Sequence, residues 1–189
     1  MLRGITVGLG FFGGIHLEGW SRVREAEIIA VVDRDEEKAG KVAARYDVRP
    51  YVDLASAIER EKPDFVDIAT RPDSHLSIAS IAASRGCHVL CQKPMAPTWR
   101  ESAEIVRVCR KHGVRLMISE NWRWQPWYRE IRGDSCRAAL QHFVDRMISG
   151  EEFETEGEDY LNQIMRTIFA GYESARTRRA IKLEEWRGR

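Results

Sequence analysis

Three glycines near the N-terminus have the spacing of a phosphate-binding turn. Gly8, Gly10 and Gly13 form the pattern Gly-x-Gly-x-x-Gly, with Phe11 and Phe12 in the same turn. The first glycine of such a pattern permits a tight turn, the second lets a pyrophosphate approach the backbone, and the third allows close packing of helix on strand. A helix that starts here presents unpaired N–H groups and its positive dipole end to phosphates. The pattern predicts a dinucleotide site; the alternative is a glycine-rich turn without a ligand.

An acidic residue stands where the ribose of such a dinucleotide would lie. Asp33 closes the second expected strand, 20 residues after Gly13. A carboxylate at this place accepts hydrogen bonds from the adenosine ribose hydroxyls and repels a 2′-phosphate, which favours NAD. Arg34 follows directly and could reach a 2′-phosphate, so NADP stays open as the alternative cofactor.

Two further strand-to-loop junctions should lie at the same sheet edge, because the carboxyl ends of parallel strands share one side. Thr70, Pro72 and His75 belong to the first junction, and Gln92 and Lys93 to the second. An ammonium group at Lys93 can hydrogen-bond a substrate hydroxyl or polarise a carbonyl during hydride transfer. Its alternative is a solvated loop lysine, and His75 is either a base or a structural or ribose-side contact.

The elements that would position these residues alternate regularly between strand and helix. Strands are expected at 3–8, 27–32, about 50–52, 64–70, 87–91 and 114–119. Helices are expected at 14–24, 35–46, from a cap at Asp53 to before Lys62, at 74–85, and at 98–112 after a Thr98/Glu101 capping box. Such alternation produces right-handed crossovers and a parallel sheet. We predict an α/β fold with a doubly wound parallel Rossmann sheet of six strands.

The regular alternation of strand and helix patterns ends after residue 120. A tryptophan-rich connector is expected at 121–134 and a C-terminal helical region at 135–189, leaving 1–120 as the NAD(P)-binding domain. A helix with Ser135 as its N-cap carries an apolar stripe from Cys136 to Ile148. A second stripe runs from Leu161 to Tyr172 after a capping-box pattern at 155–158, and the charged tail is expected to fray.

Composition excludes several classes of protein. The chain has 189 residues, with 30 basic and 29 acidic side chains and a net charge of +1, which argues against nucleic acid as a partner. Its mean hydropathy is −0.43 and no apolar run is long enough to span a membrane. The N-terminus leads straight into a strand pattern without a signal-peptide core, so we expect a cytoplasmic protein. The four cysteines are too sparse for a disulfide scaffold and are expected to be buried thiols; no metal site is predicted.

Taken in order along the chain, these motifs resemble the Gfo/Idh/MocA oxidoreductase family, the glucose–fructose oxidoreductase and inositol dehydrogenase type. The resemblance covers residues 1–132 and rests on four segments: the glycine turn with Asp33, Thr70-x-Pro72-x-x-His75, Gln92-Lys93-Pro94, and Asn121-x-Arg123-x-x-Pro126. It implies that these segments, Asn121 included, contact a nicotinamide dinucleotide and that Lys93 is the reactive lysine. The family usually has glutamate where this chain has Gln92.

The chain departs from that family in one larger respect. Family members carry a second, mostly antiparallel sheet with an Asp-x-x-x-His pair facing the nicotinamide, and this sequence contains no such pair. The chain passes from the Rossmann half to segments similar to the family's closing helices, as if the middle were removed near Arg132–Asp134. We therefore expect an NAD(P)-dependent oxidoreductase of a sugar- or polyol-like substrate with impaired turnover; the alternative is a non-catalytic dinucleotide-binding or scaffold module. The two apolar stripes need a further surface, which suggests a homodimer through the C-terminal helices, with a compact monomer as the alternative.

Overall fold

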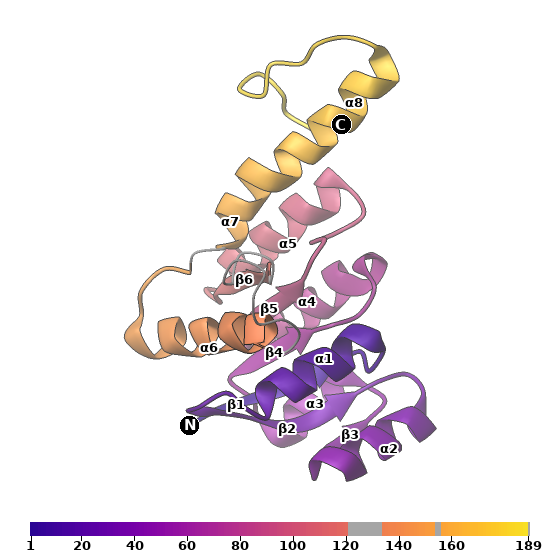
Figure 1. Ribbon diagram of the computed structural model, residues 1–189, viewed down its shortest axis with the longest axis vertical. Helices are drawn as coiled ribbons and strands as arrows, with labels where there is room; N and C mark the ends of the chain where they lie inside the picture. Colours follow the sequence, from indigo (N-terminus) through magenta and orange to yellow (C-terminus); the bar gives the residue numbers. More distant parts are fainter. Residues whose placement is uncertain (121–133, 154–155, 189) are drawn as a thin grey trace.

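The chain forms a six-stranded parallel sheet with helices on both faces (Figure 1). The computed structural model describes residues 1–120, 134–153 and 156–188. The strands are β1 (Leu2–Val7), β2 (Ala26–Val32), β3 (Arg49–Tyr51), β4 (Phe65–Ile68), β5 (His88–Gln92) and β6 (Leu116–Ser119). Their order, β3-β2-β1-β4-β5-β6, is that of a doubly wound sheet whose direction reverses between β1 and β4. The predicted fold class is confirmed.

Side-chain caps set the start of three of the crossover helices. The helices of this half are α1 (Phe11–Trp20), α2 (Glu36–Tyr46), α3 (Leu54–Glu61), the short 3₁₀ helix η1 (Pro72–Ser74), α4 (His75–Ser84) and α5 (Trp99–Lys111). Asp35, Asp53 and Thr98 each accept a hydrogen bond from a backbone N–H of the first turn of α2, α3 and α5. The expected helix 14–24 begins three residues earlier, because the helical turns start directly at the glycine-rich loop, where no apolar periodicity marks them.

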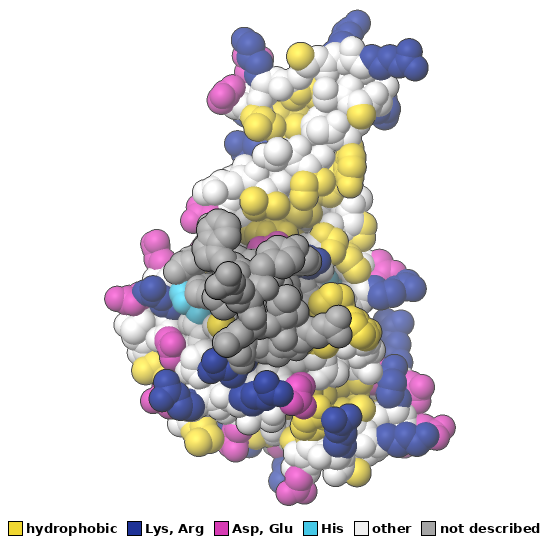
Figure 2. Space-filling model, in the orientation of Figure 1, with side chains coloured by type: hydrophobic (Ala, Val, Ile, Leu, Met, Phe, Trp, Pro, Cys, Tyr) yellow, Lys and Arg dark blue, Asp and Glu magenta, His cyan; other side chains and the backbone are white. Residues whose placement is uncertain are grey.

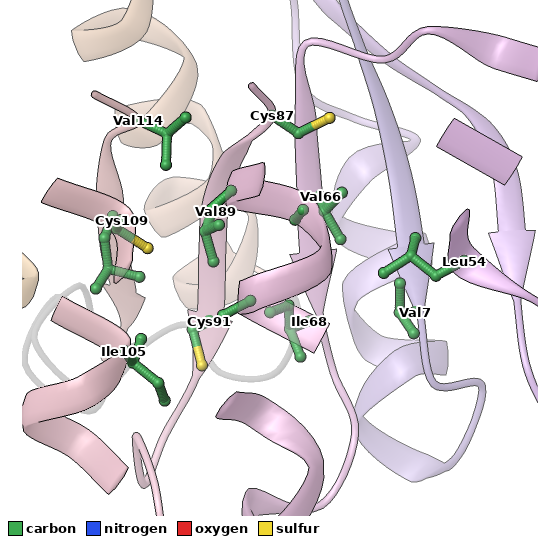
Figure 3. Close-up of a cluster of buried hydrophobic side chains, with 14 of the residues drawn as sticks. Val7, Leu54, Val66, Ile68, Cys87, Val89, Cys91, Ile105, Cys109 and Val114 are labelled. Atoms are coloured by element: carbon green, nitrogen blue, oxygen red, sulfur yellow. The ribbon is translucent and has the colours of Figure 1, made fainter. Parts of the chain in front are cut away.

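One face of the sheet packs against α3, α4 and α5. Its core is built from small and branched side chains that interdigitate between strand and helix, among them Val66, Ile68, Val89 and Ile105 (Figure 3). All four cysteines are buried and unbridged, as predicted, and burial raises the pKa of the Cys87 thiol to about 11. These thiols are packing groups of the core.

The opposite face is shared by α1, α2 and the C-terminal helix α6 (Asp134–Ser149). The apolar stripe of α6 packs over β4, β5 and β6, where Phe143 lies between Phe65 and Phe153 with ring centroids 5.2 and 5.4 Å away. The expectation that this stripe needs a surface outside the sheet is therefore wrong. Crossovers alone leave the β4–β6 half of this face uncovered, and α6 covers it. The helix also begins at Asp134, one residue before the expected cap Ser135.

A long helix extends away from the sheet beyond β6 (Figure 1). It runs through α7 (Gly157–Asp159), the π-helical turn η3 (Tyr160–Met165) and α8 (Arg166–Thr177). Its first half packs on α5 through Tyr160, Leu161 and Met165, while its second half leaves apolar side chains exposed, as Figure 2 shows. The charged tail does not fray as expected, because Trp186 packs on Trp99 with ring centroids 5.0 Å apart and donates a hydrogen bond to Glu173. None of the helices in the described ranges is long and apolar enough to cross a membrane.

Candidate functional site

The three glycines of the predicted turn have different structural roles. Gly8 has a φ of +91°, and a Cβ atom there would lie 2.6 Å from Cγ2 of Thr70. A Cβ atom on Gly13 would lie 2.0 Å from the carbonyl oxygen of Gly8, so this glycine allows α1 to pack on β1. A Cβ atom on Gly10 would meet no atom within 4 Å. Gly8 and Gly13 therefore serve the fold, and Gly10 leaves the backbone open to an approaching group.

Among residues 1–120, 134–153 and 156–188, no side chain caps the first N–H groups of α1. Its cap residue Gly10 makes no side-chain hydrogen bond, and the first turn holds no acidic residue. The helices α2, α3 and α5, in contrast, are capped by Asp35, Asp53 and Thr98. Unpaired N–H groups and a positive dipole end suit an anion such as a pyrophosphate.

Asp33 is held at the end of β2 by three donors. Its Oδ2 accepts from the backbone N–H of Leu9 at 2.9 Å and pairs with Nζ of Lys38 at 2.8 Å, and its Oδ1 accepts from the N–H of Asp35 at 3.0 Å. Burial alone raises the pKa of Asp33, but the hydrogen bonds from Lys38 and from the two backbone groups outweigh it, so the pKa lies below its ordinary value. The carboxylate is therefore charged at neutral pH and faces the glycine turn.

A groove of about 760 Å³ lies at the carboxyl ends of β1, β2 and β4. Among its lining residues are seven of the predicted cofactor contacts: Gly8, Gly10, Phe11, Phe12, Asp33, Arg34 and Thr70. The groove lies at the point where the strand order reverses, which is where doubly wound sheets bind their ligands. Its volume falls in the range of small-molecule and cofactor sites.

Lys93 lies beside this groove and is positioned by a buried chain of hydrogen bonds. Its Nζ is 6.0 Å from the ring centroid of Phe12, and a cis peptide bond joins it to Pro94. Its backbone N–H donates to Oε1 of Gln92 at 2.7 Å, and Nε2 of Gln92 lies 2.9 Å from Nε2 of His16. Nδ1 of His16 in turn lies 2.9 Å from Asp67.

The acceptors along this chain of hydrogen bonds determine which nitrogen atoms donate. Asp67 accepts from Trp20 Nε1 at 2.8 Å and from the hydroxyl of Thr6 at 3.3 Å, so a ring proton of His16 on Nδ1 points at its carboxylate. The unprotonated Nε2 of His16 then accepts from the Gln92 amide, whose oxygen is left for Lys93. Each donor of this chain of hydrogen bonds then faces an acceptor.

His75 lies outside the groove. It is fully buried, with Nδ1 3.0 Å from the carbonyl oxygen of Met95 and Nε2 3.1 Å from that of Thr70, and Cys91 Sγ lies 3.3 Å from Nδ1. Burial lowers the pKa of His75, although the carbonyl contacts oppose the shift. This geometry connects the loop after β4 to the loop after β5, a contact of the kind that the structural alternative for His75 predicts.

The structure separates the predicted contacts into three groups. Seven line the groove, Gln92 and Lys93 lie beside it, and Gly13, Pro72 and His75 are not among its lining residues; Asn121 is outside the described residues, as is the expected capping residue Thr155. Two parts of the site were not predicted from the sequence: Lys38, which pairs with Asp33, and the wall formed by Ser74, Ser77, Ile78 and Ile81. The four wall residues have i, i+3, i+4, i+7 spacing and therefore share one face of the expected helix 74–85. This spacing could have identified them from the sequence. Among the described residues, no three His, Cys, Asp or Glu side chains cluster as a metal site.

Comparison with known proteins identifies the family of the chain. Residues 2–120 match the family described as "Oxidoreductase family, NAD-binding Rossmann fold". The chain is 41% identical over 125 residues to a D-apiose dehydrogenase of Paraburkholderia graminis, covering 66% of this chain and 33% of that protein. It is 31% identical over 170 residues to a D-apiose dehydrogenase of Rhizobium rhizogenes, covering 85% of this chain and 49% of that protein. The chain thus spans half or less of the length of these curated relatives.

Two solved structures are also similar. The WlbA dehydrogenase from Bordetella pertussis, in complex with NADH and UDP-GlcNAcA, is similar with a TM-score of 0.62 and 28% sequence identity. The match covers 65% of this chain and 38% of the WlbA chain. An oxidoreductase from Agrobacterium radiobacter, in complex with NAD⁺, L-tartaric acid and magnesium, has a TM-score of 0.87 and covers 97% of this chain and 98% of its own. At 19% identity that second likeness shows the fold alone, and it extends through the C-terminal helices. By its family match over residues 2–120, this chain belongs to the Gfo/Idh/MocA oxidoreductase family.

Proposed function

We propose that the chain binds a nicotinamide dinucleotide in the groove and serves hydride transfer to or from a small sugar- or polyol-like substrate. The observation that carries this proposal is the groove itself, in which the open backbone at Gly10, the uncapped start of α1 and Asp33 come together. The family membership and the D-apiose dehydrogenases among its relatives support the class of reaction and of substrate.

The residues present fit such a cofactor. The backbone at Gly10 and the first N–H groups of α1 would hold the pyrophosphate, and Asp33 would accept from the adenosine ribose. The bound nicotinamide supplies or accepts the hydride. Lys93 is the group that we propose to hydrogen-bond the substrate oxygen and exchange its proton, because its ammonium lies beside Phe12 at the rim of the groove.

Titration with NADH tests the binding step. We expect saturable energy transfer from tryptophan to the nicotinamide in the wild-type protein, weaker binding in Asp33→Ala and none in Gly10→Val. A Cβ atom at Gly10 meets nothing within 4 Å, so the Gly10 variant should keep the wild-type melting temperature. Gly40→Val is the matched control, since Gly40 on α2 is equally open and lies outside the groove. A folded wild-type protein that binds no dinucleotide would overturn the proposal.

Turnover is a separate question with its own assay. The protein is incubated with NAD⁺ and a panel of sugars and polyols, and NADH formation is compared between the wild type and Lys93→Met. Loss of turnover in Lys93→Met with unchanged NADH affinity assigns the lysine to the chemical step. Binding without turnover on any substrate would instead assign a non-catalytic dinucleotide-binding or scaffold module.

We also propose that the chain forms a homodimer through the exposed side of α8 and the adjoining turn. Ile164, Ile168 and Tyr172 are 44%, 39% and 68% exposed there, at helical spacing (Figure 2). Exposed apolar patches often mark interfaces. Sedimentation equilibrium should give a dimer that Ile168→Glu converts to a monomer; a monomeric wild type would refute this.

A further inference from the structure

We propose that Lys38 determines cofactor selection in this groove and makes it accept the 2′-phosphorylated dinucleotide as well as NADH. This inference rests on the proposed function, because it concerns the ribose end of the same groove. Both the contacts of Asp33 and the charges around it point to this role.

The acceptor capacity of Asp33 is almost fully used in the described structure. A carboxylate offers about four lone-pair positions. Oδ2 receives Leu9 N–H and the Lys38 ammonium, and Oδ1 receives Asp35 N–H. One position, on Oδ1, is left for a ribose hydroxyl. A ribose diol that donates both hydroxyls must therefore displace Lys38 from Asp33.

The same contact removes the obstacle to a 2′-phosphate. An unpaired carboxylate would repel the phosphate, but Lys38 lies 2.8 Å from Asp33 and offsets its charge. Arg34 lines the groove next to Asp33 and adds a second cation that can pair with phosphate oxygens. With Lys38 in place, the ribose end of the groove is less favourable to a free diol and more favourable to a phosphate than Asp33 alone indicates.

Two dissociation constants measured on three proteins test the inference. NADH and NADPH are titrated into the wild type, Lys38→Met and Lys41→Met in low-salt buffer. Lys41 is the matched control, because it is an exposed lysine three residues further along α2 and pairs with Glu37 and not with Asp33. Both lysines are partly or largely exposed, so both variants should fold, which thermal unfolding checks.

We expect the wild type to bind the two dinucleotides within about tenfold of each other. In Lys38→Met the ratio of the dissociation constant for NADPH to that for NADH should rise by about tenfold or more. This is the change in affinity that corresponds to one charge-assisted hydrogen bond. Lys41→Met should leave the ratio unchanged. Arg34→Gln should weaken the binding of NADPH and leave the binding of NADH unchanged.

The outcomes separate this inference from the proposed function. If NADH binds and the ratio is the same in Lys38→Met as in the wild type, the role of Lys38 is refuted while the dinucleotide site stands. If the wild type rejects NADPH by more than about a hundredfold, acceptance of both cofactors is refuted in the same way. If a folded wild type binds neither dinucleotide, the proposed function fails and this inference fails with it.

Discussion

Replacing Asp67 by asparagine should destabilise the protein by about 3–5 kcal/mol, the sum of a lost hydrogen bond to a charged group and of a buried donor left without an acceptor. Asp67 is fully buried and accepts from Thr6, His16 and Trp20. Asparagine keeps the shape but has one acceptor oxygen and an amide that donates. With the oxygen in the place of Oδ2, on the Trp20 side, Nδ1 of His16 lies 3.0 Å from that oxygen and 2.9 Å from the new amide nitrogen, whose N–H groups face the Nδ1 proton.

The effect travels along the whole chain of hydrogen bonds. If His16 keeps its proton on Nδ1, that proton shares the one remaining oxygen with Trp20 and Thr6, and the new amide has no acceptor. If the proton moves to Nε2, it opposes the N–H group of Gln92 across 2.9 Å. If Gln92 turns its oxygen toward His16, its amide nitrogen faces the backbone N–H of Lys93 across 2.7 Å. One buried donor is left without an acceptor in each arrangement, which costs about 1–3 kcal/mol beyond the lost charged hydrogen bond.

A second substitution should repair the first. When Asp67→Asn is combined with Gln92→Glu, the amide introduced by the first change donates to Nδ1 of His16. Nε2–H of His16 then donates to the carboxylate introduced by the second change, and that carboxylate also accepts from the backbone N–H of Lys93. The ring N–H of His16 and the backbone N–H of Lys93 then have acceptors again with the proton direction reversed, so we expect more than half of the lost stability to return.

Urea unfolding of the wild type, both single variants and the double variant gives the coupling free energy directly. Asp64→Asn is the control, since Asp64 accepts one exposed backbone hydrogen bond from Arg3 and should cost less than about 1 kcal/mol. If the losses of unfolding free energy in the two single variants simply add up to the loss in the double variant, the assigned proton positions are refuted.

Three further predictions concern the glycine turn, the α6 interface and Asp33. Gly13→Ala should lower the melting temperature and abolish NADH binding together, because its Cβ atom would lie 2.0 Å from the Gly8 carbonyl oxygen; unchanged melting would contradict the packing role. Phe143→Ala should cost about 3–5 kcal/mol in urea unfolding, since its fully buried ring contacts the sheet under α6, and a loss below about 1 kcal/mol would show that α6 does not cover the sheet. Asp33→Asn should lower stability at pH 7 and match the wild type in strong acid. The folded-state pKa of Asp33 is depressed, so its contribution is present above its unfolded value of about 3.9 and is lost as the pH falls through the folded value; a difference between thermal melts that persists at the lowest pH would refute this.

The parts of the fold that follow local rules could be predicted from the sequence. The caps at Asp35, Asp53 and Thr98 act within one helical turn, and they fixed the starts of α2, α3 and α5. The glycine turn and Asp33 were found because each role depends on a residue type at a fixed spacing along the chain. The apolar segments predicted strands at the right places for the same reason.

The placement of α6 depends on topology and not on local pattern. Right-handed crossovers put α1 and α2 on one face, and the reversal after β3 puts α3, α4 and α5 on the other. These helices leave the β4–β6 half of the first face uncovered. The helix α6 packs there on the apolar residues Phe65, Leu90 and Met117. Counting the crossovers on each side of the reversal would have located this helix.

The network at His16 and the pair at Lys38 could not be predicted from the sequence. His16 lies in a stretch without apolar periodicity, and its partners Asp67 and Gln92 are 51 and 76 residues away. Lys38 carries no motif, and its importance comes from the one hydrogen-bonding position that it occupies on Asp33. His75 shows the reverse case, since its place at a junction suggested chemistry while its burial between two carbonyl groups shows a structural contact.

Nitrogen–proton NMR, which maps NAD⁺ contacts onto the backbone amides, is the decisive test of dinucleotide binding in the groove. NAD⁺ should shift the amides of Gly10, Phe11, Phe12 and Asp33 in a saturable way and leave those of α8 unchanged. Shifts confined to another surface, such as the smaller groove between α1 and α2 lined by Val42 and Tyr46, would contradict it.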